Sequence, residues 1–200
     1  MTSAQRKDTG RQNWSGQAGF TLMEVMISIF VLTVGLVSLL GVFGVAMAAT
    51  QTSQQDLIAK QLASEAMESI ITARNTSQLS WAEIQNSGTG QTPDGIFVNG
   101  TQPIDKSGAD GIIGTADDMT GSNSGPATLT LPGPDGIVGT ADDVTLPLTN
   151  YTRQIQIAAV TDSSGNVSST LRMATITVRY RTPMNRTKNY VLNSYISEYR

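Results

Sequence analysis

The apolar residues of this chain are concentrated in one long run near its N-terminus. Residues 20–49 form a run of 30 residues with one charged side chain, Glu24, near its start. As a helix this run extends about 45 Å, at about 1.5 Å per residue, whereas the hydrocarbon core of a bilayer is about 30 Å thick. The pattern therefore predicts a helix that can span a membrane.

The residues before this run are polar and basic. Arg6, Lys7 and Arg11 are accompanied by one acidic residue, Asp8. Because positive flanks stay in the cytoplasm, the N-terminus is expected inside and the rest of the chain outside. A cleaved secretory signal has an apolar core of only about 7–15 residues, so this run is too long for one. A plain single-span anchor leaves Glu24 unexplained, because a carboxylate within a span costs about 2.5–3.5 kcal/mol on insertion scales.

The spacing of apolar residues becomes amphipathic after residue 49. From Thr50 to Ala73 they recur at helical intervals, which predicts a helix that continues to about Asn75 with one apolar stripe. The stripe contains Ile58, Leu62, Ala66, Ile70 and Ala73. Such a stripe has to be buried against another element.

Alternation with a period of two dominates the last fifty residues. The segments 151–161, 171–181 and 188–199 alternate in this way and are separated by turn-forming residues. Three consecutive strands at this spacing predict an antiparallel meander, one face of which covers the apolar stripe. Basic side chains are expected on the other face or at strand ends, where they form either a solvated surface or a contact for acidic neighbours or DNA phosphates. They are Arg153, Arg172, Arg179, Arg181, Arg186 and Lys188.

The middle of the chain contains an internal repeat. Residues 76–150 are rich in Gly, Ser, Thr, Asp and Pro, which predicts loops and short strands. Within them Ala109–Thr120 recurs as Pro134–Thr145, at an offset of 25 residues, and a fainter copy begins at Pro93. Each full copy contains Asp-Gly, two apolar residues, Gly-Thr and a pair of aspartates.

Two interpretations of the repeat are open. In the first, each copy is a surface hairpin in which Asp-Gly makes the turn, the apolar pair faces inward and the aspartates cap the exit. In the second, the aspartates bind calcium, which takes about six to eight oxygen ligands. The spacing is not that of an EF-hand. The candidate ligands are Asp110, Asp117 and Asp118 in one copy and Asp135, Asp142 and Asp143 in the other.

Composition and charge narrow the classes of function. The chain has no cysteine and no histidine, so it lacks thiolate metal ligands and the commonest general base. An enzyme is not expected. Residues 76–150 carry nine acidic and one basic side chain (−8), whereas residues 151–200 carry seven basic and two acidic ones (+5). This division predicts contact between the two halves or an electrostatic fit between subunits. DNA is a disfavoured partner, because few aromatic residues accompany the basic ones to stack on bases.

The sequence GFTLME at residues 19–24, followed by the apolar helix, resembles the processing site of type IV pilins and type II secretion pseudopilins. The resemblance implies that a prepilin peptidase cuts after Gly19 and methylates the new amine of Phe20. It also implies that Glu24, the fifth residue after the cut, pairs with the N-terminal amine of a neighbouring subunit. Residues 59–75 are similar to the PilV-type minor pilins and the I-type minor pseudopilins.

These features together predict an α+β pilin fold, in which a long N-terminal helix packs on an antiparallel β-sheet. The expected divisions are a leader peptide at 1–19, a transmembrane and filament-core helix at 20–49, its amphipathic continuation at 50–75, a Gly/Asp-rich loop region at 76–150 and a β-meander at 151–200. The chain is expected to be a single-pass protein of the bacterial inner membrane with its N-terminus in the cytoplasm. It is then expected to enter a pilus or pseudopilus on the cell surface or in the periplasm.

Three functional classes follow, led by a minor pilin of a type IV pilus. The alternatives are a minor pseudopilin of a type II secretion system and a membrane-anchored, calcium-dependent binding module. The expected partners are other pilin or pseudopilin subunits, the prepilin peptidase, the inner-membrane assembly platform and membrane lipid.

The two interpretations of the repeat differ in their response to calcium. If the aspartates form a calcium site, millimolar calcium raises the melting temperature of the soluble domain, because an ion that binds the folded state stabilises it. Thermal unfolding with calcium is compared with unfolding in magnesium at equal ionic strength. An unchanged melting temperature contradicts the calcium interpretation.

Overall fold

The computed structural model describes residues 19–90, 94–119 and 125–199. It contains one long α-helix, α1 (Leu22–Asn75), and an antiparallel β-sheet. This is the α+β layout that the sequence predicts, so the predicted fold class is confirmed. The expected leader up to residue 18 lies outside the described residues, as do Pro93 and Thr120 at the ends of the repeats.

The chain divides into two compact units, Met1–Ala46 and Met47–Arg200. In the first unit, the described part of α1 exposes all of its side chains, including Phe30 (69% exposed) and Leu40 (61%). By its length and composition the helix can cross a membrane. Nothing described within this unit covers the apolar side chains of residues 20–46, so they need an apolar environment from outside this unit.

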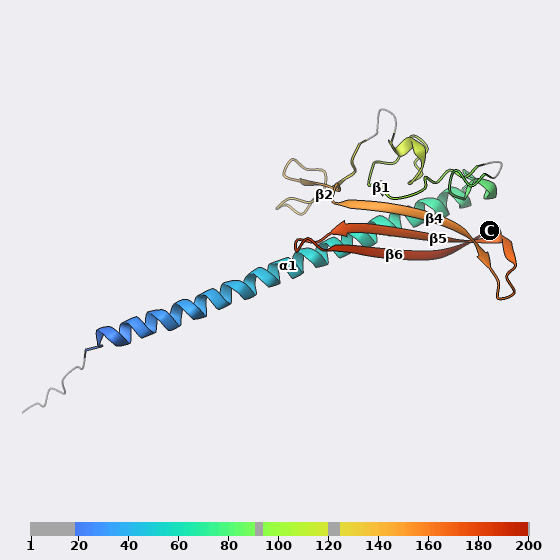
Figure 1. Cartoon of the computed structure of the whole chain (residues 1–200). Coiled ribbons are helices and arrows are strands. Elements are labelled where there is room, and N and C mark those ends of the chain that lie inside the picture. The colour runs from blue at the N-terminus through green and yellow to red at the C-terminus, as the bar shows by residue number, and fades with distance from the viewer. Residues whose placement is uncertain (1–18, 91–93, 120–124, 200) are drawn as a thin grey trace, which may run out of the picture. The chain divides into compact units, whose positions relative to one another are not determined.

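The main sheet of the second unit has the strand order β1-β4-β5-β6. A meander of three long strands forms most of it, and β1 is a short edge (Figure 1). The strands are β1 (Gln102–Pro103), β4 (Tyr151–Thr161), β5 (Val167–Arg181) and β6 (Thr187–Ser197). All of their pairings are antiparallel, as the alternation of the sequence predicts.

The core of the second unit lies between the later part of α1 and the sheet. The helix contributes a stripe that includes Ala63 and Ala66, both fully buried, beside Ile70. From β5, alternate residues point into the same core, and Ile176 and Val178 are fully buried. Small residues on the helix let the strands approach closely, so the predicted stripe is buried against the predicted face of the sheet.

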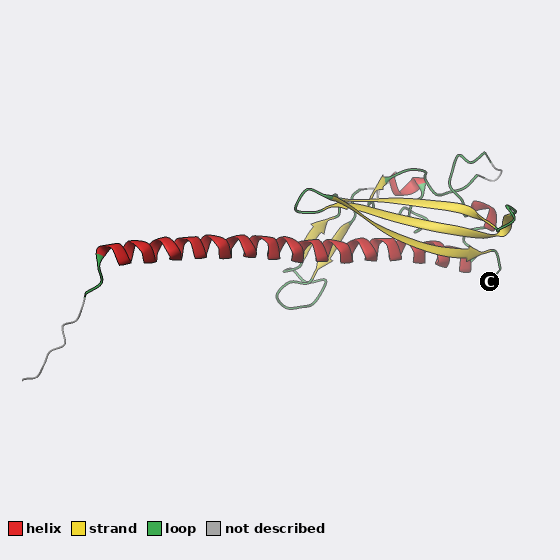
Figure 2. Ribbon diagram, turned by 60° about the horizontal axis from the view of Figure 1, so that its bottom comes forward, coloured by secondary structure: helices red, strands yellow, loops and turns green. Residues whose placement is uncertain are grey.

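The region between helix and meander is irregular but supplies much of the core. It contains two 3₁₀ helices and a separate antiparallel hairpin (Figure 2). These elements are η1 (Trp81–Glu83), η2 (Ala116–Met119), β2 (Thr128–Leu131) and β3 (Val144–Pro147). Buried side chains from this region include Ile84, Phe97, Ile104 and Leu148. The loops therefore close the core and are more than surface connections.

Arg172 differs from its predicted place on a solvated surface. Its guanidinium lies 4.4 Å from the ring centroid of Trp81 and donates hydrogen bonds to the carbonyl oxygens of Trp81 and Ile84. The prediction of a solvated position is therefore wrong for this residue. Arg172 attaches η1 to the sheet through a cation–π contact and two charge-assisted hydrogen bonds.

The buried stripe of α1 predicts unequal effects of two truncations on the same helix. Ile70→Ala is expected to lower the free energy of unfolding by about 2–5 kcal/mol, because it leaves a cavity in the core. Leu57→Ala, at a side chain that is 60% exposed, is expected to change it by less than about 0.5 kcal/mol. Urea unfolding of a fragment covering residues 47–200 makes the comparison, and equal losses contradict this packing.

Candidate functional site

The predicted processing residues lie at the start of the described chain. Gly19 and Phe20 precede the first residue of α1, and the Phe20 side chain is 82% exposed. Thr21 caps the helix, since its hydroxyl accepts the N–H of Glu24 at 3.3 Å. The Gly19–Phe20 bond therefore lies in exposed backbone outside the helix.

Glu24 lies in the first turn of α1 with its side chain exposed. Within the part of the chain that the structure describes, its carboxylate has no hydrogen-bond or ion-pair partner. A carboxylate in an apolar helix is costly when unpaired. The described residues therefore supply no partner for the Glu24 carboxylate.

The first copy of the repeat is a loop held together by its own aspartates. Asp110 accepts the N–H of Ile112 at 2.8 Å, and Asp117 accepts the N–H of Asp110 at 3.3 Å. Asp118 accepts the N–H of Gly114 at 2.6 Å. Each aspartate thus binds a backbone donor inside the loop, as in Asx turns.

The second copy repeats every one of these bonds 25 residues later. Asp135 accepts the N–H of Ile137 at 2.9 Å, Asp142 accepts the N–H of Asp135 at 3.4 Å, and Asp143 accepts the N–H of Gly139 at 2.6 Å. Similar local sequence therefore produces the same set of aspartate–backbone hydrogen bonds in both copies. The hydrogen bonds are those that the turn interpretation requires.

A threonine completes each loop. The Thr115 hydroxyl donates to Asp117, and the Thr140 hydroxyl donates to Asp142 at 2.6 Å. These bonds stabilise the ionised carboxylates and are the largest cause that lowers the pKa of both aspartates. Both carboxylates therefore stay charged down to more acidic pH than an ordinary aspartate.

The structural repeat begins one residue before Ala109 and Pro134, at a glycine in each copy. A Cβ atom at Gly108 would lie 2.1 Å from Asp117 Oδ2, and one at Gly133 would lie 2.3 Å from Asp142 Oδ2. Only glycine fits where the loop closes on itself this tightly. The glycine at the same place in both copies was the sequence signal for this requirement.

The two copies differ in what covers their apolar pair. In the first, Ile112 and Ile113 are only 3% and 7% exposed, and the N–H of Ile113 donates to Ser69 Oγ on α1 at 3.1 Å. In the second, Ile137 and Val138 are each 61% exposed. The prediction that the apolar pair faces inward is therefore right for the first copy and wrong for the second.

The calcium prediction stays a prediction. In both loops carboxylate oxygens accept backbone N–H groups, and among the described residues no group of three or more acidic side chains is arranged to hold a metal ion. Asp118 is 6% exposed, and burial raises its pKa. The geometry thus supports the turn interpretation, on which the aspartates serve the loop itself.

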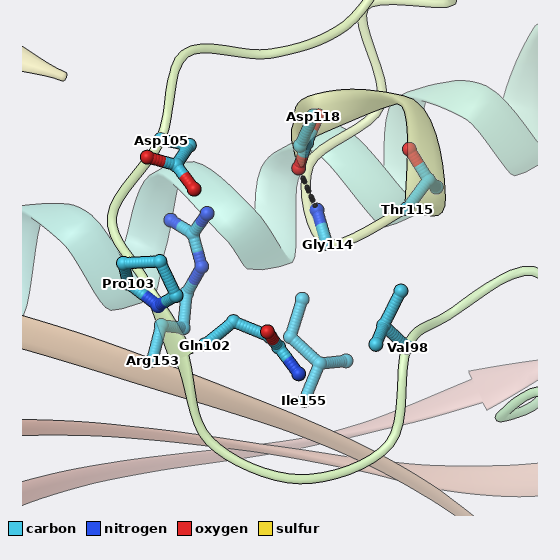
Figure 3. Close-up of a pocket in the computed structure, with 9 residues that line it drawn as sticks. All are labelled: Val98, Gln102, Pro103, Asp105, Gly114, Thr115, Asp118, Arg153 and Ile155. Atoms are coloured by element: carbon cyan, nitrogen blue, oxygen red, sulfur yellow. Dashed lines mark hydrogen bonds between the residues drawn. The ribbon is translucent and has the colours of Figure 1, made fainter. Parts of the chain in front are cut away.

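Arg153 lies beside the first loop and is buried in the second unit (Figure 3). It is 5% exposed, and burial lowers its pKa, while the charges of Glu65, Asp118 and Asp105 act in the opposite direction. Figure 3 shows its guanidinium directed at Asp105. Arg153 therefore joins strand β4 to the acidic loops electrostatically, which realises the predicted contact between acidic middle and basic tail.

The predicted position of Arg153 on a solvated surface is wrong, although the residue lies near the start of β4. The alternation of β4 itself contained the signal. Tyr151, Arg153 and Ile155 share one parity, and all three are buried. The residue type of Arg153 predicts a surface position, whereas its place in the alternation of β4 predicts a core position, and the second is correct.

The comparisons with known proteins concern the N-terminal segment. The family model described as the prokaryotic N-terminal methylation motif matches residues 14–40. No curated protein and no solved structure matches the chain. The motif supports a type IV pilin or pseudopilin, processing by prepilin peptidase and anchoring in the inner membrane.

Equivalent substitutions in the two loops are expected to lower the free energy of unfolding by different amounts. Asp117→Ala removes the acceptor of Asp110 N–H and Thr115, so it is expected to lower the free energy of unfolding by about 1–3 kcal/mol. Asp142→Ala removes the same bonds from an exposed loop and is expected to cost less than about 0.5 kcal/mol globally. Urea unfolding measures both in the 47–200 fragment. If both substitutions lower the free energy of unfolding equally, the statement that only the first loop packs into the core is contradicted.

Proposed function

We propose that this chain is a structural subunit of a type IV pilus, a minor pilin that assembles through its N-terminal helix after removal of its leader. The observation that carries the proposal is the methylation motif at residues 14–40, which includes the start of an apolar helix with exposed side chains. Residues 59–75 support the assignment to minor pilins by their similarity to the PilV-type branch.

Processing is the first step of the proposed function. Cleavage after Gly19 releases residues 1–19 and leaves a free amine on Phe20, which the same peptidase methylates. The exposed, non-helical backbone at Gly19 and Phe20 is consistent with access by a peptidase. The new amine carries a positive charge in the same apolar region as Glu24.

Assembly is the second step. The apolar helix lies in lipid before assembly and packs on the helices of other subunits afterwards. Glu24 pairs with the Phe20 amine of a neighbour, so that two charges in an apolar environment neutralise each other. At Gly35, Gly41 and Gly44 a Cβ would meet nothing within 4 Å, so these positions are open to a second helix, and small residues permit close approach.

The remaining part of the chain is proposed to form the outward-facing head. Its composition lacks cysteine and histidine, and its buried charges serve the packing of its own loops. A structural role therefore fits the described residues. The proposed partners are other pilin subunits, the prepilin peptidase, the assembly platform and membrane lipid.

A minor pseudopilin of a type II secretion system is the second candidate, because the methylation motif is shared by both families. Capture of the full chain from membranes, with identification of the assembly proteins that accompany it, distinguishes the two. The amount of the chain in sheared filaments decides between a minor and a major subunit.

Glu24→Ala tests the proposed role of the carboxylate in assembly. The variant is expected to insert into the membrane as the parent does, since removing a charge from a span does not oppose insertion. Its incorporation into sheared filaments is expected to fall more than tenfold, because the neighbour's amine loses its partner. Immunoblots of membranes and filaments measure both steps.

Glu68→Ala, on the same helix but in the second unit, is the matched control and should assemble normally. Equal incorporation of Glu24→Ala and the parent contradicts the role of Glu24. Loss of both variants from filaments indicates a general effect of altering α1.

A further inference from the structure

The hairpin β2–β3 carries apolar side chains that nothing in the described chain covers. Leu131 is 42% exposed and Val144 is 59% exposed, and Ile137 and Val138 in the connecting loop are each 61% exposed. We call these four residues the hairpin patch. In the first copy of the repeat the residues equivalent to Ile137 and Val138 are buried, so this loop is built to present such a pair to a packing surface.

The hairpin patch continues outward from the core of the head. Leu131 pairs directly with Val144, and Leu129 pairs with Leu146. Because these pairs are two residues apart, all four side chains lie on one face of the hairpin. Leu129 packs on the core, whereas the outer pair is open to solvent. An isolated two-stranded hairpin is marginally stable in water, so a partner on this face would stabilise it.

The charge around the hairpin patch restricts the partner. Residues 128–147 contain three acidic side chains, Asp135, Asp142 and Asp143, and no basic one. An anionic lipid surface would be repelled by this rim. The complementary surface is apolar with a basic border.

Such a surface exists on the same chain, at the turn between β5 and β6. Met184 is 56% exposed at this turn, and the exposed Arg181 and Arg186 flank it. Residues 179–189 contain four basic side chains and no acidic one. We call Arg181, Met184 and Arg186 the basic turn.

The hairpin patch and the basic turn do not cover each other within one molecule. They belong to different sheets, and Ile137, Val138 and Met184 each stay more than half exposed. A contact between two different patches is heterologous, and a heterologous contact that does not close into a ring produces a helical assembly.

We propose that the hairpin patch of one copy of this chain docks on the basic turn of a second copy. Ile137 and Val138 pack on Met184, while the aspartates of the loop face Arg181 and Arg186. The inference rests on the proposed function, because assembly into a filament brings the heads of subunits together, and it adds that two copies of this chain meet there. It specifies which faces of two heads meet.

Cysteine cross-linking tests the contact, because the chain has no cysteine of its own. Full-length Val138→Cys and Met184→Cys chains, each with a different tag, are co-expressed and treated with a short bismaleimide. Both side chains are exposed, so the substitutions leave the fold intact. A mixed dimer is expected, together with a ladder of oligomers when one chain carries both substitutions.

Val167→Cys is the matched control, since this residue is 66% exposed but lies at the start of β5, at the opposite end of that strand from Met184. Paired with Val138→Cys it is expected to give at least fivefold less mixed dimer. Arg186→Glu in the Met184→Cys chain is expected to lower the yield at least threefold. Lys60→Glu, on α1, should leave it unchanged.

The outcomes separate this contact from the proposed function when membranes and sheared filaments are analysed in parallel. A chain present in filaments without the Val138–Met184 product overturns the docking and leaves the pilin assignment standing. The product in membranes, with no chain in filaments, supports the docking and overturns the filament role. Symmetric Val138–Val138 dimers, or equal yields with Val167→Cys, overturn the docking.

Discussion

The need to cover the apolar surface of α1 governs the rest of this molecule. In the second unit the sheet and the irregular region cover one stripe, on which Ala63, Ala66 and Ile70 are fully buried. Within the first unit nothing described covers the helix, and its apolar side chains are exposed. The same helix is therefore buried by its own unit in one part and needs apolar surroundings from outside its unit in the other.

In the repeated loops, local interactions determine the hydrogen bonds and tertiary packing determines the burial of the aliphatic pair. Aspartate, glycine and threonine at fixed spacing produce one hydrogen-bond network in both places, because all its donors and acceptors lie within eleven residues. Burial of the aliphatic pair depends on what lies nearby. The first pair packs beside α1, whereas the second projects from a two-stranded hairpin, and this difference makes the second loop available to another molecule.

The charged side chains of the head also differ in burial according to the segments that lie near them. Most basic residues of the meander are exposed, as their type suggests, but Arg153 is buried where the acidic loops cross β4. A buried guanidinium is tolerated only near opposite charge, and Glu65, Asp105 and Asp118 supply that charge from three different segments. The contact between acidic and basic halves thus lies inside the head. The remaining charges, on the second loop and the β5–β6 turn, stay at its surface.

Sequence alone determined the features that depend on periodicity and on short motifs. The apolar run, the amphipathic stripe, the three-strand meander and the turns of the repeat follow from the spacing of residues that are close together in the chain. The roles expected of Gly19 and Glu24 follow from the resemblance to prepilin processing sites. Only the tertiary structure decided which copy of the repeat is buried, that Arg172 stacks on Trp81 and that the charges of Glu65, Asp105 and Asp118 act on Arg153. These outcomes depend on which distant segments meet, and that information is absent from any short window of the chain.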